Sequence, residues 1–356
     1  MKRFLLMAAA ATAMLTACEK TEMVPTGDAQ EISFVAVNKV ATKAPVENAT
    51  FLTSDDMDVV AYLAAGDGAT PGTYFTETKF TNANQTSTWT GKRYWPLSTA
   101  TINFLAVTNT GGGVTAHVEN AFDNTTPASK VVSTLIGNND ASQTDLMFAA
   151  GQGTHTQGAA YTNVPMVFKH SLSWINFQVR TTHNNDNDQP KININSITLN
   201  NVPVNGTLTV VNDNYDKTDN SCITGNLSAN WEYSDADLVD MKLVETGIVT
   251  DDFKNDLLLT VSFAEFGGKG ILVIPCLQTS FTINYTITQP DGTSNIFDYT
   301  YNLAGDNIKW EMAKKYVYHI SMTLSEIEIE PSVTSWGEPV STYPSLDGQG
   351  NEEVKP

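Results

Sequence analysis

The residue with the clearest chemical role in this sequence is Cys18, which ends the run Leu15-Thr16-Ala17-Cys18. Lys2 and Arg3 give the chain a basic start, and residues 4–15 are mostly apolar and uncharged. That stretch is too short for a permanent membrane-spanning helix, which needs roughly 20 residues. The pattern is typical of a bacterial lipoprotein signal, whose cysteine is acylated before cleavage. We therefore expect a lipid on Cys18; an ordinary secretory signal with an incidental cysteine is the alternative.

The other residues that could do chemistry form no recognisable catalytic pattern. The sequence has no zinc-protease, nucleophile-elbow, phosphate-loop or dinucleotide-binding motif. Five histidines are scattered along it, and His170 and His319 lie in predicted strands, where a structural hydrogen bond is the expected role. Asp213, Asp216 and Asp219 share one loop but lack the ligand order of a calcium loop, so a solvated turn is expected. We predict no enzyme activity, no metal and no cofactor.

Cysteines and aromatic residues also favour structural roles. Cys276 ends an apolar run and is predicted to be a buried thiol, while a disulfide with Cys222 remains open in an oxidising compartment. Trp89, Tyr94 and Trp95 could form a platform for a sugar. Because Tyr94 and Trp95 stand at a strand boundary beside a proline, we expect them first in the core.

Charge and length limit the classes of function that remain. The 356-residue chain has a net charge of −19, and removal of residues 1–17 makes it −21, since two basic and no acidic residues are lost. Such an acidic chain has no electrostatic footprint for nucleic acid or for an anionic membrane surface. Its length favours two domains over a single large core.

Strand-like alternation dominates the sequence from residue 31 onward. Apolar, Thr-rich and Tyr-rich stretches are separated by Gly, Pro, Asn and Asp clusters, which is typical of antiparallel β-sandwiches. Helical spacing is weak and confined to residues 132–147 and 234–244. We predict an all-β fold with few short helices. The clearest predicted strands are residues 58–64, 101–107, 174–180, 192–199, 257–263 and 281–288.

The expected organisation is a tandem of two sandwiches between polar ends. Residues 18–30 resemble a tether, and the Gly-, Thr- and Gln-rich residues 152–162 lack strand character and indicate a boundary near Val164-Pro165. The tail, residues 337–356, is too polar and too rich in Pro and Gly for a core of its own. The predicted domains are residues 31–165 and 166–336.

A change of parity marks the end of the second predicted domain. Tyr316, Tyr318, Ile320, Met322 and Leu324 alternate on even positions, whereas Ile327 and Ile329 fall on odd ones. A bulge or break near Ser325-Glu326 is needed to keep both sets in the core. Glu326, Glu328 and Glu330 then face solvent, with a cation site as the alternative reading.

An ordered series of segments resembles the fimbrillin family, the pilin-like lipoproteins that build type V pili of Gram-negative bacteria. No single segment is diagnostic, but their order spans most of the chain. The series consists of Ile32-Ser33-Phe34, Ala41-Thr42-Lys43-Ala44-Pro45, Trp89-Thr90-Gly91-Lys92-Arg93-Tyr94-Trp95-Pro96, Ile102-Asn103-Phe104-Leu105-Ala106, Asp145-Leu146-Met147-Phe148-Ala149, Val167-Phe168-Lys169-His170-Ser171-Leu172-Ser173, Ile271-Leu272-Val273-Ile274-Pro275, Tyr285, Trp310, Tyr316-Val317-Tyr318 and Val333-Thr334-Ser335-Trp336.

The resemblance implies a fold and a way of assembly. Fimbrillin-like proteins have two transthyretin-like β-sandwich domains and travel to the outer membrane as lipoproteins. In stalk subunits a trypsin-like protease cuts beyond the first strand, and a strand from a neighbouring subunit fills the groove that this opens. The matching positions are the strand residues Ile32, Phe34 and Ala36 and the basic residues Lys39 and Lys43; the family commonly has Arg where this chain has Lys43.

The function implied is that of a structural, tip or anchor component of a surface fimbria that supports cell adhesion. Its partners would be other fimbrial subunits, of this or a paralogous chain, and the outer membrane through the lipid on Cys18. We expect the donor strand to come from residues 337–356, where Val340, Tyr343 and Leu346 are apolar side chains that it could offer. The alternative is a surface lipoprotein that binds a glycan or host protein and does not polymerise.

Overall fold

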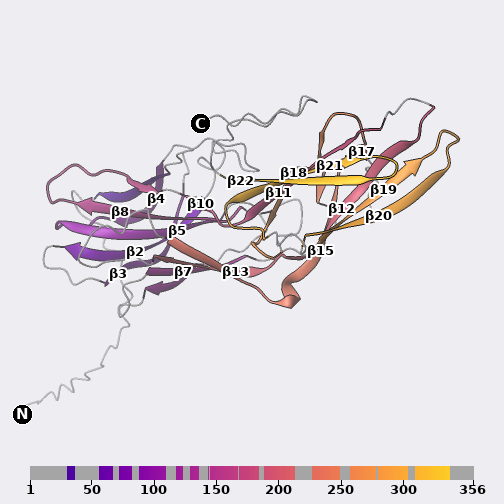
Figure 1. Cartoon of the computed structure of the whole chain (residues 1–356). Helices are drawn as coiled ribbons and strands as arrows, with labels where there is room; N and C mark the ends of the chain where they lie inside the picture. Colours follow the sequence, from indigo (N-terminus) through magenta and orange to yellow (C-terminus); the bar gives the residue numbers. More distant parts are fainter. Residues whose placement is uncertain are drawn as a thin grey trace, which may run out of the picture.

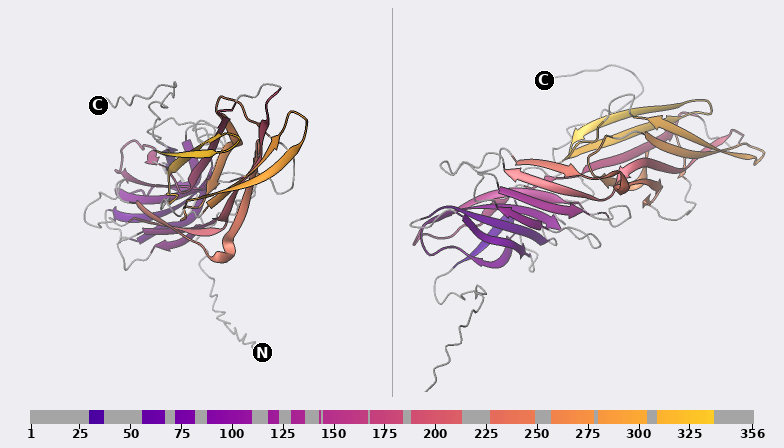
Figure 2. Two further views of the ribbon diagram at one scale, coloured as in Figure 1. Left: turned by 45° about the vertical axis from the view of Figure 1, so that its right-hand side comes forward. Right: turned by 90° about the horizontal axis from the view of Figure 1, so that it is seen from below.

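The computed structural model describes most of the chain after residue 30 and shows an elongated molecule built from β-sheets (Figure 1). Strands of the N-terminal half gather at one end and those of the C-terminal half at the other (Figure 2). The described residues are 30–36, 56–66, 72–81, 88–109, 118–122, 129–135, 143, 145–166, 168–183, 188–212, 227–248, 257–277, 280–303 and 309–336.

Two sheets pack face to face in the N-terminal half. A three-stranded sheet has the order β4-β1-β9 and contains β4 (Thr88–Tyr94), β1 (Glu31–Ala36) and β9 (Val164–Met166). A five-stranded sheet has the order β10-β8-β5-β2-β3 and contains β10 (Lys169–His170), β8 (Met147–His155), β5 (Ala100–Asn109), β2 (Asp56–Gly66) and β3 (Gly72–Phe80).

Two further sheets form the C-terminal half. The four-stranded sheet has the order β18-β11-β21-β22 and contains β18 (Ala264–Val273), β11 (Ser173–Thr181), β21 (Lys314–Met322) and β22 (Ile327–Ser335). The second sheet has the order β16-β15-β12-β19-β20, with β17 also on β12, and contains β16 (Gly247–Ile248), β15 (Leu238–Val244), β12 (Lys191–Pro203), β19 (Ser280–Thr288), β20 (Ser294–Asn302) and β17 (Leu257–Leu258).

A fifth sheet joins strands from both halves of the sequence. Its order is β14-β13-β7-β6, and it contains β14 (Leu227–Glu232), β13 (Gly206–Asn212), β7 (Ser129–Leu135) and β6 (Val118–Phe122). β13 pairs antiparallel with β7 along its whole length, from Gly206 opposite Leu135 to Asn212 opposite Ser129. The domain limit predicted at residue 165 stays a prediction. The hairpin of β13 and β14 follows that limit in the sequence, yet β13 pairs with β7, which precedes it.

Three clusters of buried side chains lie between these sheets. One fills the N-terminal sandwich and includes Ile32, Phe34 and Phe104. A second fills the C-terminal sandwich and includes Phe281 and Tyr318. The third contains residues of both halves, such as Leu105, Trp231 and Leu272; the aliphatic and aromatic positions of the predicted strands thus supply all three cores.

The all-β prediction is confirmed, with details that differ from the sequence pattern. Most pairings are antiparallel, but β1 with β9 and β11 with β21 are parallel. In the described part of the chain the helical structure is a single 3-10 turn, η1 (Asp235–Asp237), and the rest of the predicted helical segment 234–244 is strand β15.

Two strand predictions are wrong in extent. Of residues 257–263, only Leu257 and Leu258 form a strand, β17, and the chain then continues without strand geometry until β18 begins at Ala264. Strand β18 includes Gly267 and Gly268, both at positive φ. Residues 152–155 belong to β8 instead of a boundary segment. Periodicity reports the local pattern, whereas pairing with a neighbour decides where a strand ends.

The predicted parity break is confirmed as a tight hairpin, but Leu324, which was expected in the core, lies in the turn after β21 and is 41% exposed. Thr323 N–H donates to the Glu326 carbonyl over 2.8 Å, and Met322 pairs with Ile327 on the returning strand. The turn thereby places Ile320 opposite Ile329 on one face. Glu328 and Glu330 are exposed, as predicted.

Candidate functional site: the slot of the first strand

Strand β1 is the central strand of its sheet, with a neighbour on each side. It runs antiparallel to β4, where Phe34 pairs with Trp89, and parallel to β9, where Phe34 pairs with Val164. A central strand satisfies backbone donors and acceptors on both of its edges. Loss of β1 would therefore leave two strands with unpaired backbone groups facing a common slot.

The side chains of β1 that face inward are anchored in the N-terminal core. Ile32 and Phe34 are both 0% exposed. The Phe34 ring meets Phe80 and Phe104 edge-on, with centroids 4.8 and 4.9 Å apart, which is the favourable geometry for aromatic pairs. Burial of each such side chain stabilises the fold by roughly 1.5–3 kcal/mol.

Polar contacts with both neighbouring segments fix the register of β1. Trp95 N–H donates to the Gln30 carbonyl over 3.0 Å, and Lys92 N–H donates to the Glu31 carboxylate over 2.7 Å. On the other side, the Ser33 hydroxyl donates to Asn163 Oδ1 over 2.5 Å. Both neighbouring segments thus hold β1 through side chains as well as backbone.

Two glycines of β8 allow β9 and the Trp95 ring to approach the five-stranded sheet closely. A Cβ on Gly153 of β8 would lie 2.4 Å from the Trp95 ring and 2.8 Å from Val164 of β9. A Cβ on Gly151 would lie 2.8 Å from the Pro165 carbonyl oxygen. Sequence reasoning missed this role; the alternation Gly151-Gln152-Gly153 was the available signal.

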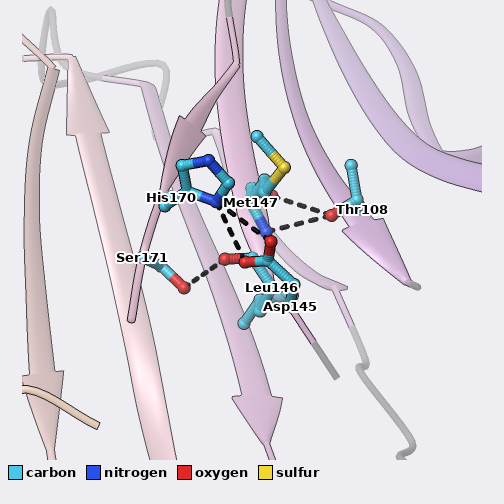
Figure 3. Close-up of polar contacts among 6 residues, drawn as sticks. All are labelled: Thr108, Asp145, Leu146, Met147, His170 and Ser171. Atoms are coloured by element: carbon cyan, nitrogen blue, oxygen red, sulfur yellow. Dashed lines mark hydrogen bonds and ion pairs between the residues drawn. The ribbon is translucent and has the colours of Figure 1, made fainter. Parts of the chain in front are cut away.

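A buried polar cluster ties β8 and the residues just before it to β10 and Ser171 (Figure 3). His170 Nδ1 lies 3.1 and 3.0 Å from the two oxygens of Asp145, which is 1% exposed. The Ser171 hydroxyl donates to the Leu146 carbonyl, and Met147 N–H donates to Thr108 Oγ1 over 2.9 Å. The structural hydrogen bond predicted for His170 is confirmed.

Trp336, the last described residue, extends this cluster to the C-terminal sandwich. Its ring stacks on His170 with centroids 3.6 Å apart and an interplanar angle of 10°. Its backbone N–H donates to the Ala313 carbonyl over 2.8 Å. Three separate segments of the predicted motif series, around residues 145, 170 and 336, therefore meet at the junction between the two sandwiches.

Other predicted residues divide between the core and the undescribed part of the chain. Trp95 is buried in the N-terminal core, as expected, whereas Tyr94 is only half-buried; Trp89, the third residue of the possible sugar platform, is buried as well. Cys276 is 4% exposed, and burial raises the pKa of its thiol to about 12, in agreement with a packed thiol. Ala36 ends β1, where it pairs with Met166. Cys18, Lys39, Lys43, Cys222, the aspartates at 213, 216 and 219, and residues 337–356 lie outside the described residues.

Clusters of metal-binding side chains and membrane-spanning helices are both absent from the described ranges. Those ranges hold no group of three His, Cys, Asp or Glu side chains placed to bind a metal ion. They also contain no helix with the length and apolar character to span a membrane.

The family follows from comparison with known proteins. A family model described as fimbrillin-like matches residues 42–336. The chain belongs to the fimbrillin-like family. The match starts after β1 and includes the other strands of both sandwiches, so the resemblance found in the motif series is confirmed. No curated protein sequence matches this fimbrillin-like chain.

Several solved structures are similar to this chain at low sequence identity. A fimbrial protein from Bacteroides vulgatus is 16% identical, with 87% of this chain and 100% of the other covered, at a TM-score of 0.53. A fimbrial assembly protein from Parabacteroides distasonis is 8% identical over 86% and 99% of the chains, at 0.41. The fimbrial anchor protein Mfa2 from Porphyromonas gingivalis is 10% identical over 87% and 98%, at 0.36. The first of these supports the fold of the fimbrillin-like chain.

Proposed function

We propose that this protein is a structural or accessory component of a bacterial surface fimbria and that it assembles by strand exchange at the slot of β1. The observation that carries the proposal is the central position of β1 between β4 and β9, with Ile32 and Phe34 completely buried. A protein of this kind needs no catalytic centre, metal or cofactor, and we propose that it has none.

Cleavage after Lys39 or Lys43 would detach β1 from the rest of the chain. Both lysines follow β1 and precede β2 in the sequence, so either cut separates Ile32 and Phe34 from their covalent connection to the core. An emptied slot exposes apolar pockets and two open strand edges, which favours capture of an extended segment by strand addition. The cut also removes the lipid expected on Cys18.

The slot sets requirements for the incoming strand. It must place apolar side chains at positions i and i+2, with an aromatic ring or a group of similar volume in the site of Phe34. In the tail, Val340, Tyr343 and Leu346 are spaced by three, and Pro339 and Pro344 lack the N–H that a central strand donates. The spacing of three fits this requirement poorly, so the tail of another subunit can fill the slot only in part through residues 340–343, and a paralogous subunit is the alternative donor.

The location that we propose is the outer surface of the cell, with the outer membrane as the first attachment site through Cys18. A Cys18→Ala variant should be released from washed outer membranes, because the lipid supplies the anchoring. Retention of the variant at the level of the parent would contradict this part of the proposal.

The test of strand exchange compares the polymers formed by the parent and by three variants. Ladders resistant to sodium dodecyl sulfate should be lost when Lys39 and Lys43 are both replaced by Gln and when residues 337–356 are deleted. Lys79→Gln, which changes an exposed lysine of β3, is the matched control and should polymerise like the parent. Unchanged ladders in both test variants would refute exchange through these segments.

A surface lipoprotein that binds a glycan or host protein is the second candidate. The observation in its favour is that β1 is fully seated, with hydrogen bonds from both neighbours. A parent chain that keeps residues 18–38 on the cell surface and forms no ladder would support this reading.

A further inference from the structure

The edge strand β20 has the features of a surface for strand addition. It ends the sheet β16-β15-β12-β19-β20 and lies on the outer side of the C-terminal half (Figures 1 and 2). It pairs with β19 over nine successive residues, from Ser294 to Asn302, without a register shift. An edge strand of this length presents a row of backbone donors and acceptors to a partner.

Features that normally protect an edge are missing from β20. Its sequence, Ser-Asn-Ile-Phe-Asp-Tyr-Thr-Tyr-Asn, contains a single charge, Asp298, and no Lys or Pro. Ile296 is 69% exposed and Phe297 is 42% exposed. The edge strand β22 differs, since it carries the exposed residues Glu328, Glu330 and Pro331. Charges and proline on an edge strand discourage pairing with another chain. Strand β22 is therefore protected against such pairing, whereas β20 is not.

The two faces of β20 have distinct side chains. Phe297, Tyr299 and Tyr301 lie opposite Tyr285, Ile283 and Phe281 of β19 and so share the face that packs on the C-terminal core. The Phe297 ring stacks on Tyr285 with centroids 5.4 Å apart. Ile296, Asp298 and Thr300 occupy the outer face, where Asp298 accepts a hydrogen bond from Asn284 over 2.7 Å. An added strand must match this alternation.

We propose that a second copy of this chain docks on β20 by symmetric antiparallel pairing centred on Tyr299. In that register Phe297 of each copy lies opposite Tyr301 of the other, Tyr299 lies opposite its equivalent, and Thr300 lies opposite Asp298. Aromatic pairs then align on one face, and no like charges meet on the other. A two-fold axis makes the contact self-complementary, so it closes as a dimer. The proposal does not depend on exchange at the slot of β1.

Registers centred nearer to the start of β20 are less favourable for physical reasons. Centring on Asp298 would set two carboxylates directly opposite each other, and centring on Phe297 would set Ile296 against Asp298. Like charges directly opposite destabilise a sheet, as does an apolar side chain that buries an unpaired carboxylate. A shift by one residue would mismatch the two faces of the strand.

The first experiment measures the dissociation constant of the dimer by analytical ultracentrifugation at about 0.15 M salt, where distant exposed charges are screened. The mature chain with Cys18→Ser is the parent. Thr300→Asp places a new carboxylate opposite Asp298 at two symmetric positions and should weaken the dimer by about tenfold. Thr300→Lys should tighten it, because the same position then carries the opposite charge. Ser294→Asp is the control, since residue 294 lies outside the overlap and its change should have no effect.

The second experiment reads the register directly. Tyr299→Cys should form a disulfide between two copies under mild oxidation, because residues directly opposite in an antiparallel pair have Cα atoms about 4.5–5.5 Å apart. Asn295→Cys should not, since eight residues of offset separate the two copies of that position by roughly 26 Å. A parent chain that stays monomeric at all concentrations, equal affinities for Thr300→Asp and Thr300→Lys, or equal cross-linking at both cysteines would overturn the proposal.

Discussion

At the scale of single residues, Phe34 is the side chain that most tightly couples β1 to the core. Phe34→Ala should lower the free energy of unfolding by about 3–5 kcal/mol, because it removes a completely buried ring and leaves a cavity between Phe80 and Phe104. Urea unfolding monitored by circular dichroism measures the loss. Val35→Ala, a half-buried neighbour on the other face, should cost much less, and equal losses would contradict the assigned role of Phe34.

A second prediction concerns Cys276. Burial raises the pKa of its thiol to about 12, whereas an unfolded cysteine titrates near ~8.5. The folded state therefore holds this proton to higher pH, so the stability linked to it is complete below about 8.5 and is lost as pH rises toward 12. Between these values the unfolding free energy should fall more steeply for the parent than for Cys276→Ala. Parallel slopes in the two chains would contradict burial of the thiol.

At the scale of elements, β8 is the strand that fixes the position of β9 and of the slot. Gly153→Ala should destabilise the protein by about 1–3 kcal/mol, because the new Cβ would overlap the Trp95 ring and Val164. Thermal and urea unfolding measure this cost. Thr154→Ala, the exposed neighbour on the same strand, should lose less, and a Gly153→Ala variant as stable as the parent would show that β9 can move away freely.

The same elements show what periodicity could and could not predict. The strand around residues 281–288 was predictable because one of its faces is buried and alternation records it. The strands around residues 58–64 and 101–107 are buried on both faces and show instead as short, mostly apolar runs. The strand expected at 257–263 was wrong, because those residues lie beside β12 over two positions and then leave the sheet. Burial of Ile32 and Phe34 was predictable from alternation; the neighbours that bury them were not.

At the scale of the whole molecule, the hairpin β13–β14 makes the two halves interdependent. A fragment of residues 30–166 lacks β13, so β7 would keep β6 but lose its other antiparallel partner, and Leu105 and Phe148 would lose their packing against Leu208 and Trp231. We expect this fragment to be largely insoluble or to lack a cooperative thermal transition, in contrast to the full chain. A fragment with a sharp transition and strand content close to that of the corresponding part of the whole chain would contradict this coupling.

The sequence by itself determined the class of the fold, the acidic surface, the family and the buried side chains of β1. Each of these depends on composition or on patterns within a few neighbouring residues, and alternation, turn residues and motif order record such patterns directly.

Only the tertiary structure decided that β1 lies between β4 and β9, that β13 crosses to β7, and that Asp145, His170 and Trp336 meet at the junction. These contacts join segments that are tens to hundreds of positions apart. Backbone hydrogen bonds are available to any partner strand, so the choice among partners depends on how all side chains pack together, as the glycines of β8 do against β9 and Trp95.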